Sequence, residues 1–219
     1  MTMIISEVKG QIDKTLWFSA LEKELRELLR SLKPGSLADL AREFINSQYY
    51  KSYCYAPAAQ IYHHNYAGGL LEHSLGTARI AIKIAELHSE VDRDLILLGA
   101  VLHDLGKVQE LDMGKEISYS EEGKLLGHIL LGIGMIEQLM QRAGTDGIVR
   151  SKLIHMIASH HGRYEWQSPK KPMFLEAQIL HLADMMDAEI WKFKSAQPSA
   201  EDSRWSQYMK TIGSQVFLG

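Results

Sequence analysis

Apolar residues recur every three or four positions along most of this chain, with charged residues between them, and this spacing forms one face of an α-helix. The first such segment runs from about Asp13 to Leu32 and ends before Pro34-Gly35, a pair that favours a break. A second begins at Ser36, a favourable N-cap residue, and reaches Ile45. Further helices are predicted over residues 70–88, 93–105, 120–143, 147–159 and 173–193.

The segments between these helices are short or irregular. Residues 49–57 are aromatic, and we expect a loop or a short helix packed on the body. Residues 117–119 are expected to be extended, a long loop precedes the helix that starts at Met173, and a short helix is expected near 201–212. Strand-like alternation is nearly absent, so the pattern predicts an all-α, bundle-like domain.

Composition restricts the functional classes. The chain has 219 residues, of which 46% are hydrophobic and 23% charged, as in an ordinary globular protein. Its net charge of −3 gives no sign of general nucleic-acid binding, which would need a local basic groove. No apolar stretch approaches the ~20 residues that cross a membrane, and no export signal begins the chain. With Cys54 as the single cysteine, we expect a cytoplasmic protein without membrane association.

The chemistry centres on residues 103–107. An apolar run that ends at Leu102 is followed by His103-Asp104, and Lys107 lies three positions after the aspartate. A carboxylate buried at the end of such a helix is costly unless its charge is compensated, and a divalent ion would compensate it. A lysine at this spacing could hold a phosphate oxygen as a point charge.

Other candidate ligands are distant in sequence and lie on different predicted helices. The full candidate set is His73, His103, Asp104, His128, His160, His161 and Asp184. Imidazole and carboxylate donors together suit Mn, Fe, Zn, Co or Ni. The set exceeds the four ligands of a tetrahedral zinc, so it favours two ions bridged by a carboxylate, at the ~3.5–4 Å spacing that serves phosphoryl hydrolysis. His181 is expected to orient a ligand or to pack in the core, and His160-His161 could instead cap a helix end.

The order His73, His103-Asp104 and Asp184 resembles the signature of the HD-domain metal-dependent phosphohydrolases, and residues 103–107 match its central motif. The similarity extends to longer runs, namely 63–73, 122–128, 159–162 and 180–184. These runs resemble the HD half of the YhaM-type 3′–5′ exoribonucleases, over roughly residues 40–215.

The resemblance implies a helical HD fold and a divalent-metal-dependent phosphohydrolase. Its substrate would be a phosphorylated small molecule such as a nucleotide, or the 3′ end of single-stranded nucleic acid, attacked by a metal-bound hydroxide. The implied first metal set is His73, His103, Asp104 and Asp184, with His128 and His160 on a second ion. His161 would be a further ligand or a phosphate contact, and Asp104, Lys107 and His161 are the expected catalytic residues, with His64 as a further phosphate contact.

Two other functions remain open from the sequence. One is a non-catalytic regulatory or ligand-binding HD module in which metal is structural, and the other is an HD-like di-iron oxygenase.

We expect an N-terminal helical extension (1–48) and an HD-type domain (49–219). The related exonucleases carry an N-terminal OB-fold that binds single strands. The first 40 residues here show a helical pattern. We therefore expect this binding of single strands to be missing or to be supplied by a partner chain. The extension could dock on the body or form the interface of a homo-oligomer.

Overall fold

The computed structural model describes residues 14–61, 64–145, 147–200 and 203–219. Its helices are α2 (Lys14–Arg30), α3 (Ser36–Asn46), α4 (Gln48–Tyr55), α5 (Gly69–Leu87), α6 (Arg93–Leu102), α7 (Lys107–Glu110), α8 (Glu121–Ala143), α9 (Gly147–Ser159), η1 (Tyr164–Trp166) and α10 (Leu175–Lys194). Two short strands, β1 (Leu111–Met113) and β2 (Ile117–Tyr119), form an antiparallel hairpin. The predicted all-α fold is confirmed, and among the described helices none is both long and apolar enough to cross a bilayer.

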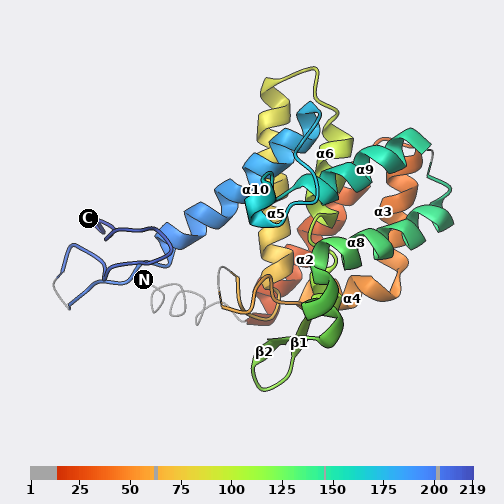
Figure 1. Ribbon diagram of the computed structural model, residues 1–219. Helices are drawn as coiled ribbons and strands as arrows, with labels where there is room; N and C mark the ends of the chain where they lie inside the picture. The colour runs from red at the N-terminus through yellow and green to blue at the C-terminus, as the bar shows by residue number, and fades with distance from the viewer. Residues whose placement is uncertain (1–13, 62–63, 146, 201–202) are drawn as a thin grey trace.

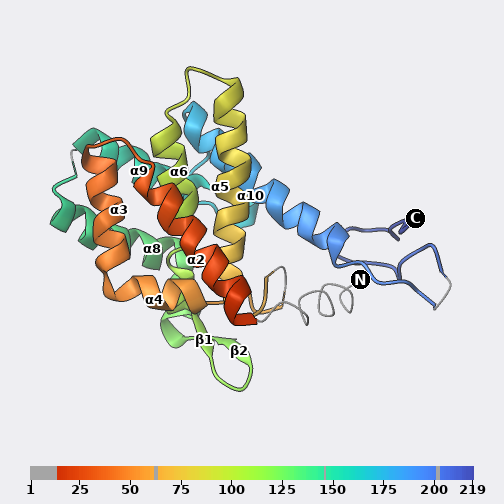
Figure 2. The same cartoon turned by 180° about the vertical axis from the view of Figure 1, so that it is seen from behind.

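The bundle is built around α6, in which every residue from Asp94 to Leu102 is buried. Helices α5 and α10 pack beside it, and α8 and α9 complete the layer on one side (Figure 1). The view from behind shows α2 and α3 on the other side (Figure 2). A helix that is apolar all round has to be enclosed by others, which is why the end of α6 lies deep in the molecule.

The N-terminal helices dock on the body, one of the two arrangements that the sequence allowed. Leu25 of α2 and Phe44 of α3 are fully buried in the same core as Leu97 of α6. Arg79 of α5 donates to Glu24 of α2 over 2.7 Å, which ties this layer to the body. The boundary at residue 48 stays a prediction, and residues 1–13 of the predicted extension lie outside the described part.

Three details of the helix prediction are wrong. Helix α6 ends at Leu102 instead of 105, because residues 103–106 form a turn in which the Lys107 amide donates to the Asp104 carbonyl. Ser36 is the first residue of α3 and not its N-cap. The expected helix near 201–212 is replaced, over residues 203–219, by an irregular arm with isolated bridges such as Trp205–Phe217. The centres of these two rings lie 5.1 Å apart, and backbone hydrogen bonds across the arm, such as that from the Ser206 amide to the Val216 carbonyl (2.8 Å), hold the arm together.

The docked position of α3 predicts a large effect of a core substitution. Phe44→Ala leaves a cavity between α3 and the body, and we expect the free energy of unfolding to fall by about 3–5 kcal/mol in urea titration. Leu16→Ala on α2 is the control, because this side chain is 65% exposed, and a change within about 0.5 kcal/mol is expected. Equal effects of the two substitutions would contradict the docked arrangement.

Candidate metal centre

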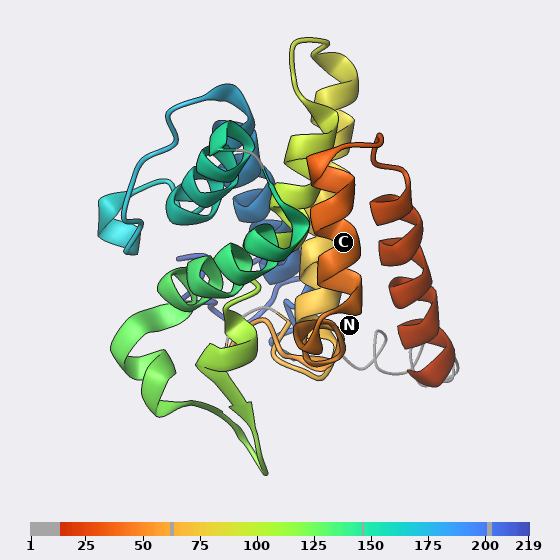
Figure 3. The same ribbon diagram turned by 90° about the vertical axis from the view of Figure 1, so that its right-hand side faces the viewer.

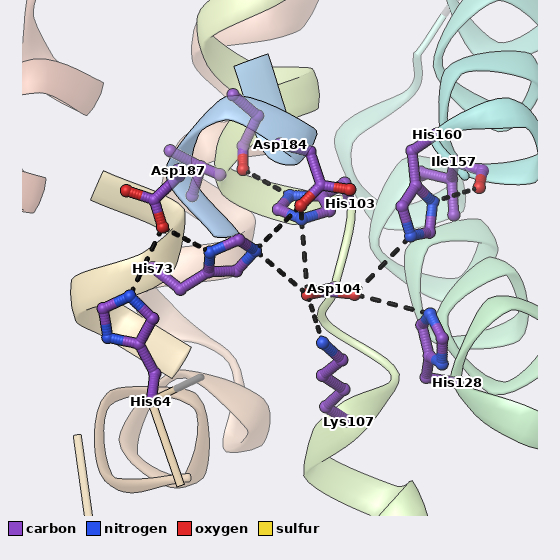
Figure 4. Close-up of polar contacts among 12 residues, drawn as sticks. His64, His73, His103, Asp104, Lys107, His128, Ile157, His160, Asp184 and Asp187 are labelled. Carbon is purple, nitrogen blue, oxygen red and sulfur yellow. Dashed lines mark hydrogen bonds and ion pairs between the residues drawn. The ribbon is translucent and has the colours of Figure 1, made fainter. Parts of the chain in front are cut away.

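Asp104 lies at the centre of the site, in the turn that follows α6, and is only 2% exposed. Its Oδ2 atom is 3.3 Å from Nε2 of His103 and 3.5 Å from Nε2 of His73. Its Oδ1 atom is 3.5 Å from Nε2 of His128 and 3.6 Å from Nε2 of His160. Figure 4 shows the carboxylate between these two pairs of rings. Each oxygen therefore faces a different set of candidate ligands.

The first set joins three elements that are far apart in sequence. His73 is on α5, His103 follows α6, and Asp184 is on α10. Oδ1 of Asp184 is 3.1 Å from Nε2 of His73 and 3.8 Å from Nε2 of His103. One donor atom from each residue lies within 4.8 Å of the others, which is close enough for a single metal ion to be shared.

The second set consists of His128 on α8 and His160 and His161 directly after α9, again with donor atoms within 4.8 Å of one another. His128 follows an interruption of α8 at Gly127, whose φ of 71° and ψ of 160° are readily adopted only by glycine. This break frees the His128 amide, which donates to Oε1 of Glu110 over 2.9 Å. The kink thus turns the His128 ring toward Asp104.

All five of these imidazoles are held through Nδ1, and in His73 the Nε2 atom also lies 3.1 Å from Oδ1 of Asp184. The Nδ1 contacts are His103 to the Ala100 carbonyl (2.8 Å), His160 to the Ile157 carbonyl (2.7 Å), His161 to the Trp166 carbonyl (2.7 Å), His73 to Asp187 Oδ2 (2.8 Å) and His128 to Glu110 Oε1 (3.2 Å). An Nδ1–H donor of this kind fixes the tautomer that presents a lone pair on Nε2.

Several inward-facing atoms in the described part of the molecule have no hydrogen-bond partner. These are Nε2 of His103, His128 and His160, and Oδ1 of Asp104. Buried polar atoms are nearly always satisfied in native proteins, so such a convergent group needs an explanation. The donor set of imidazoles and carboxylates fits a divalent transition-metal ion. The structure therefore carries His/Asp clusters that could bind such ions, as the sequence predicts.

Lys107 compensates part of the charge at the centre, since its Nζ lies 2.6 Å from Oδ2 of Asp104. Burial raises the pKa of the Asp104 carboxyl, but Lys107 and the neighbouring imidazole of His103 more than offset this and hold it well below the usual value. Burial lowers the pKa of Lys107, and the same carboxylate more than reverses that effect. Both groups are therefore charged at neutral pH.

The imidazoles differ in their readiness to lose a proton. Burial holds the pKa of His160 well below its usual value, and burial together with the neighbouring imidazole of His128 lowers the pKa of His161, so both rings are neutral as metal ligands must be. Burial also lowers the pKa of His73, but its bonds to Asp184 and Asp187 outweigh this and raise it to about 9. Metal binding at His73 would therefore displace a proton.

Glycines allow the elements that carry these residues to approach closely. A Cβ atom on Gly106 would lie 1.9 Å from the carbonyl oxygen of His128, so α7 and α8 are in backbone contact. A Cβ atom on Gly76 of α5 would lie 2.0 Å from Oδ1 of Asp187 on α10. Both contacts bring ligand-bearing segments together.

The six other predicted ligands and Lys107 gather around Asp104, but sequence reasoning missed two carboxylates that hold histidines of the set, Asp187 and Glu110. Asp187 lies three residues after Asp184, a spacing that shares a helix face and could have revealed it. His64 lies on the far side of Asp187 from Asp104, with Nε2 3.3 Å from Asp187 Oδ2 (Figure 4). His63, in the same motif, lies outside the described residues.

His181 is buried beside the segment that carries His160. Its Nδ1 donates to the His160 carbonyl over 2.8 Å, and its ring packs against Gly162. A cavity of about 1000 Å³ opens beside the metal centre. Its walls include Asp104, Lys107, His128, His161, Trp166 and Asp184. The site is thus accessible to a ligand from one side.

Comparison with known proteins agrees with this geometry. The family model of the HD domain matches residues 70–189. The 3′–5′ exoribonuclease YhaM of Shouchella clausii is 37% identical over 174 residues, which cover 80% of this chain and 54% of the relative. The protein of the same name in Listeria innocua is 37% identical over 167 residues, which cover 76% of this chain and 53% of the relative. That of a Geobacillus species is 33% identical over 195 residues, which cover 89% of this chain and 60% of the relative.

The chain spans just over half the length of these curated relatives. No solved structure gives a significant match. The resemblance to HD-domain phosphohydrolases and to the HD half of the YhaM-type enzymes is confirmed, and it supports a metal-dependent hydrolase. Because the family model covers more than half of the sequence, the chain belongs to the HD-domain family.

Proposed function

We propose that this protein is a divalent-metal-dependent phosphodiesterase that removes nucleotides from the 3′ end of single-stranded nucleic acid. The observation that carries the proposal is the position of Asp104, whose two oxygens each face two imidazole Nε2 atoms at 3.3–3.6 Å. This arrangement supports two ions on either side of one bridging carboxylate. The names of the relatives support nucleic acid over an unrelated phosphate ester.

The proposed ligands divide into two sets that share Asp104. His73, His103 and Asp184 would hold one ion, and His128, His160 and His161 the other. Metal ions held by these residues would activate a water for attack and would stabilise the negative charge that develops on the phosphodiester oxygens. Mn, Fe, Zn, Co and Ni all suit these donors, and we propose Mn²⁺ as the first ion to test.

The charged residues of the chain have distinct proposed roles. Asp104 remains ionised because Lys107 lies against it. Each of its two oxygens could therefore bind a cation. Lys107 also lines the cavity, where its ammonium group would attract the phosphate oxygens. His161 is half-buried at the cavity wall and would contact either the second ion or the phosphate.

Asp187 and Glu110 are proposed as positioning residues, one for each half of the site. Asp187 accepts from Nδ1 of His73, and Glu110 accepts from both Nδ1 and the backbone amide of His128. The other ring nitrogens of these histidines face Asp104. A carboxylate behind an imidazole fixes its orientation and makes it a stronger donor.

Loss of a central ligand should abolish hydrolysis. We expect the protein with Mn²⁺ to cleave bis-p-nitrophenyl phosphate and short oligonucleotides, and His103→Ala and Asp104→Asn to lower kcat/KM by at least about 10²–10³-fold. His88→Ala is the matched control, because this histidine is exposed and does not line the cavity. Circular dichroism checks that each variant folds. A metal-loaded wild-type protein that cleaves no phosphate compound would rule the proposal out.

The positioning residues should act on metal affinity. Asp187→Asn and Glu110→Gln keep the shape of the side chain but remove its charge, and we expect each to weaken Mn²⁺ binding by about 10–100-fold in calorimetric titration. Glu122→Gln on the exposed side of α8 serves as the control. If the two variants lose thermal stability but bind Mn²⁺ as the wild type does, these carboxylates are only structural.

Removal of metal separates catalysis from a structural role. Chelation by EDTA should abolish hydrolysis but leave the helical circular dichroism in place, because the core around α6 is apolar and does not depend on the ions. Added Mn²⁺ should restore activity. Melting of the helices on chelation, together with a loaded protein that turns over nothing, would instead favour the regulatory module with a structural metal.

A further inference from the structure

The segment between α9 and α10 differs in charge from the rest of the chain. We call residues 163–171 the basic–aromatic loop, because it contains three cations (Arg163, Lys170 and Lys171), one carboxylate (Glu165) and two aromatic rings. The rings are exposed, 58% for Tyr164 and 43% for Trp166. A positive segment in a chain of net charge −3 is the local basic surface that a nucleic-acid ligand would need.

The basic–aromatic loop is held in one conformation against the end of α9. Ser168 is buried, and its Oγ lies 2.7 Å from the carbonyl oxygen of Lys170, to which it donates, and 3.2 Å from that of Ala158. The Lys170 amide also donates to the Ala158 carbonyl (3.3 Å), and Gln167 adopts a positive φ of 64° that ends η1. Figure 3 shows this segment, in cyan, at the edge of the molecule next to α9. Its rings are thus presented on an ordered surface.

The loop is connected directly to the metal centre. Nδ1 of His161 donates to the carbonyl of Trp166, and the Trp166 ring lies 6.1 Å from the ring of His181. Trp166 and Gln167 both line the cavity beside Asp104. The backbone that orients a proposed ligand therefore also places an exposed indole at the cavity wall.

The basic–aromatic loop places cationic side chains next to exposed aromatic rings, an arrangement typical of surfaces that bind single-stranded nucleic acid. The Arg163 guanidinium lies 4.7 Å from the centre of the Trp166 ring, and Lys171 Nζ lies 5.2 Å from that of Tyr164. Exposed aromatic rings stack with nucleobases of any sequence, while nearby cations bind the phosphates that follow. A small phosphorylated molecule would be enclosed by the cavity. Tyr164 is not among the residues that line the cavity, so the binding surface extends beyond it.

We propose that the basic–aromatic loop is the surface on which single-stranded nucleic acid lies while its 3′ end enters the cavity. The terminal base stacks on Trp166, the preceding base on Tyr164, and Lys170 and Lys171 bind the phosphates further along the strand. This inference rests on the function proposed above and identifies its substrate as a polymer.

The cations are tested by the salt dependence of binding. The probe is a short fluorescent single-stranded oligonucleotide with phosphorothioate linkages, bound to the Mn²⁺-loaded protein and followed by anisotropy. Lys170→Gln/Lys171→Gln should weaken binding and reduce the slope of log affinity against log salt by about 1.4, the value for two single-strand phosphate contacts. Lys23→Gln/Lys51→Gln, on the exposed faces of α2 and α4, should leave the slope unchanged.

The stacking contact is tested with the same probe. Trp166→Ala should weaken binding by about 5- to 150-fold without changing the salt slope, and Trp166→Phe should retain most of the affinity. An oligonucleotide whose 3′-terminal nucleotide carries no base should bind the wild type and Trp166→Ala with equal affinity. Phe193→Ala on α10 is the control, because this aromatic ring is 52% exposed and does not line the cavity.

Hydrolysis of bis-p-nitrophenyl phosphate by the wild type is measured in parallel and reports only on the proposed function. If the wild type hydrolyses this compound but the loop variants bind the oligonucleotide as tightly as it does, the inference is wrong and the phosphodiesterase remains. If the loop variants lose binding while no compound is hydrolysed, the nucleic-acid surface stands and the proposed activity falls.

Discussion

The structure depends on how the charge of Asp104 is compensated. This carboxylate is 2% exposed at the end of a helix that is buried from Asp94 to Leu102. Burying a carboxylate there without charged or hydrogen-bonding partners would cost several kcal/mol in lost hydration. Lys107 supplies one positive charge at 2.6 Å, but the opposite oxygen faces only imidazole nitrogens. Asp184 adds a second carboxylate to the site, and this negative charge, together with neutral imidazoles such as His160, is what makes the centre suited to cations.

Much of the bundle is predictable because burial imposes a periodicity on the sequence. Helices α5, α8, α9 and α10 lie within a few residues of their predicted ranges, since apolar positions at helical spacing have to face a common core. The C-terminal arm is not predictable in this way. Its segments are joined by isolated backbone bridges and by the pairing of Trp205 with Phe217, contacts between residues too far apart in sequence for a local periodicity to predict them.

The candidate site shows the same division between local and distant information. His103 and Asp104 are adjacent in sequence and follow an apolar run, so their importance is visible locally. Asp187 acts on His73, which is 114 positions away, and Glu110 acts on His128 across a kink that depends on the conformation of Gly127. From sequence alone, a carboxylate on a helix is expected to face solvent. Only the fold shows which histidine ring it contacts.

The absence of a side chain at position 106 has a consequence for the dimensions of the centre. Gly106 touches the backbone of His128, so nothing but main-chain atoms separates the segment that carries Asp104 from the segment that carries the His128 ring. The approach of these two segments is therefore limited by main-chain atoms. Main-chain thickness does not vary with the packing of neighbouring side chains. Substitutions elsewhere on α8 can thus reshape the cavity wall while the spacing between Asp104 and His128 stays constant.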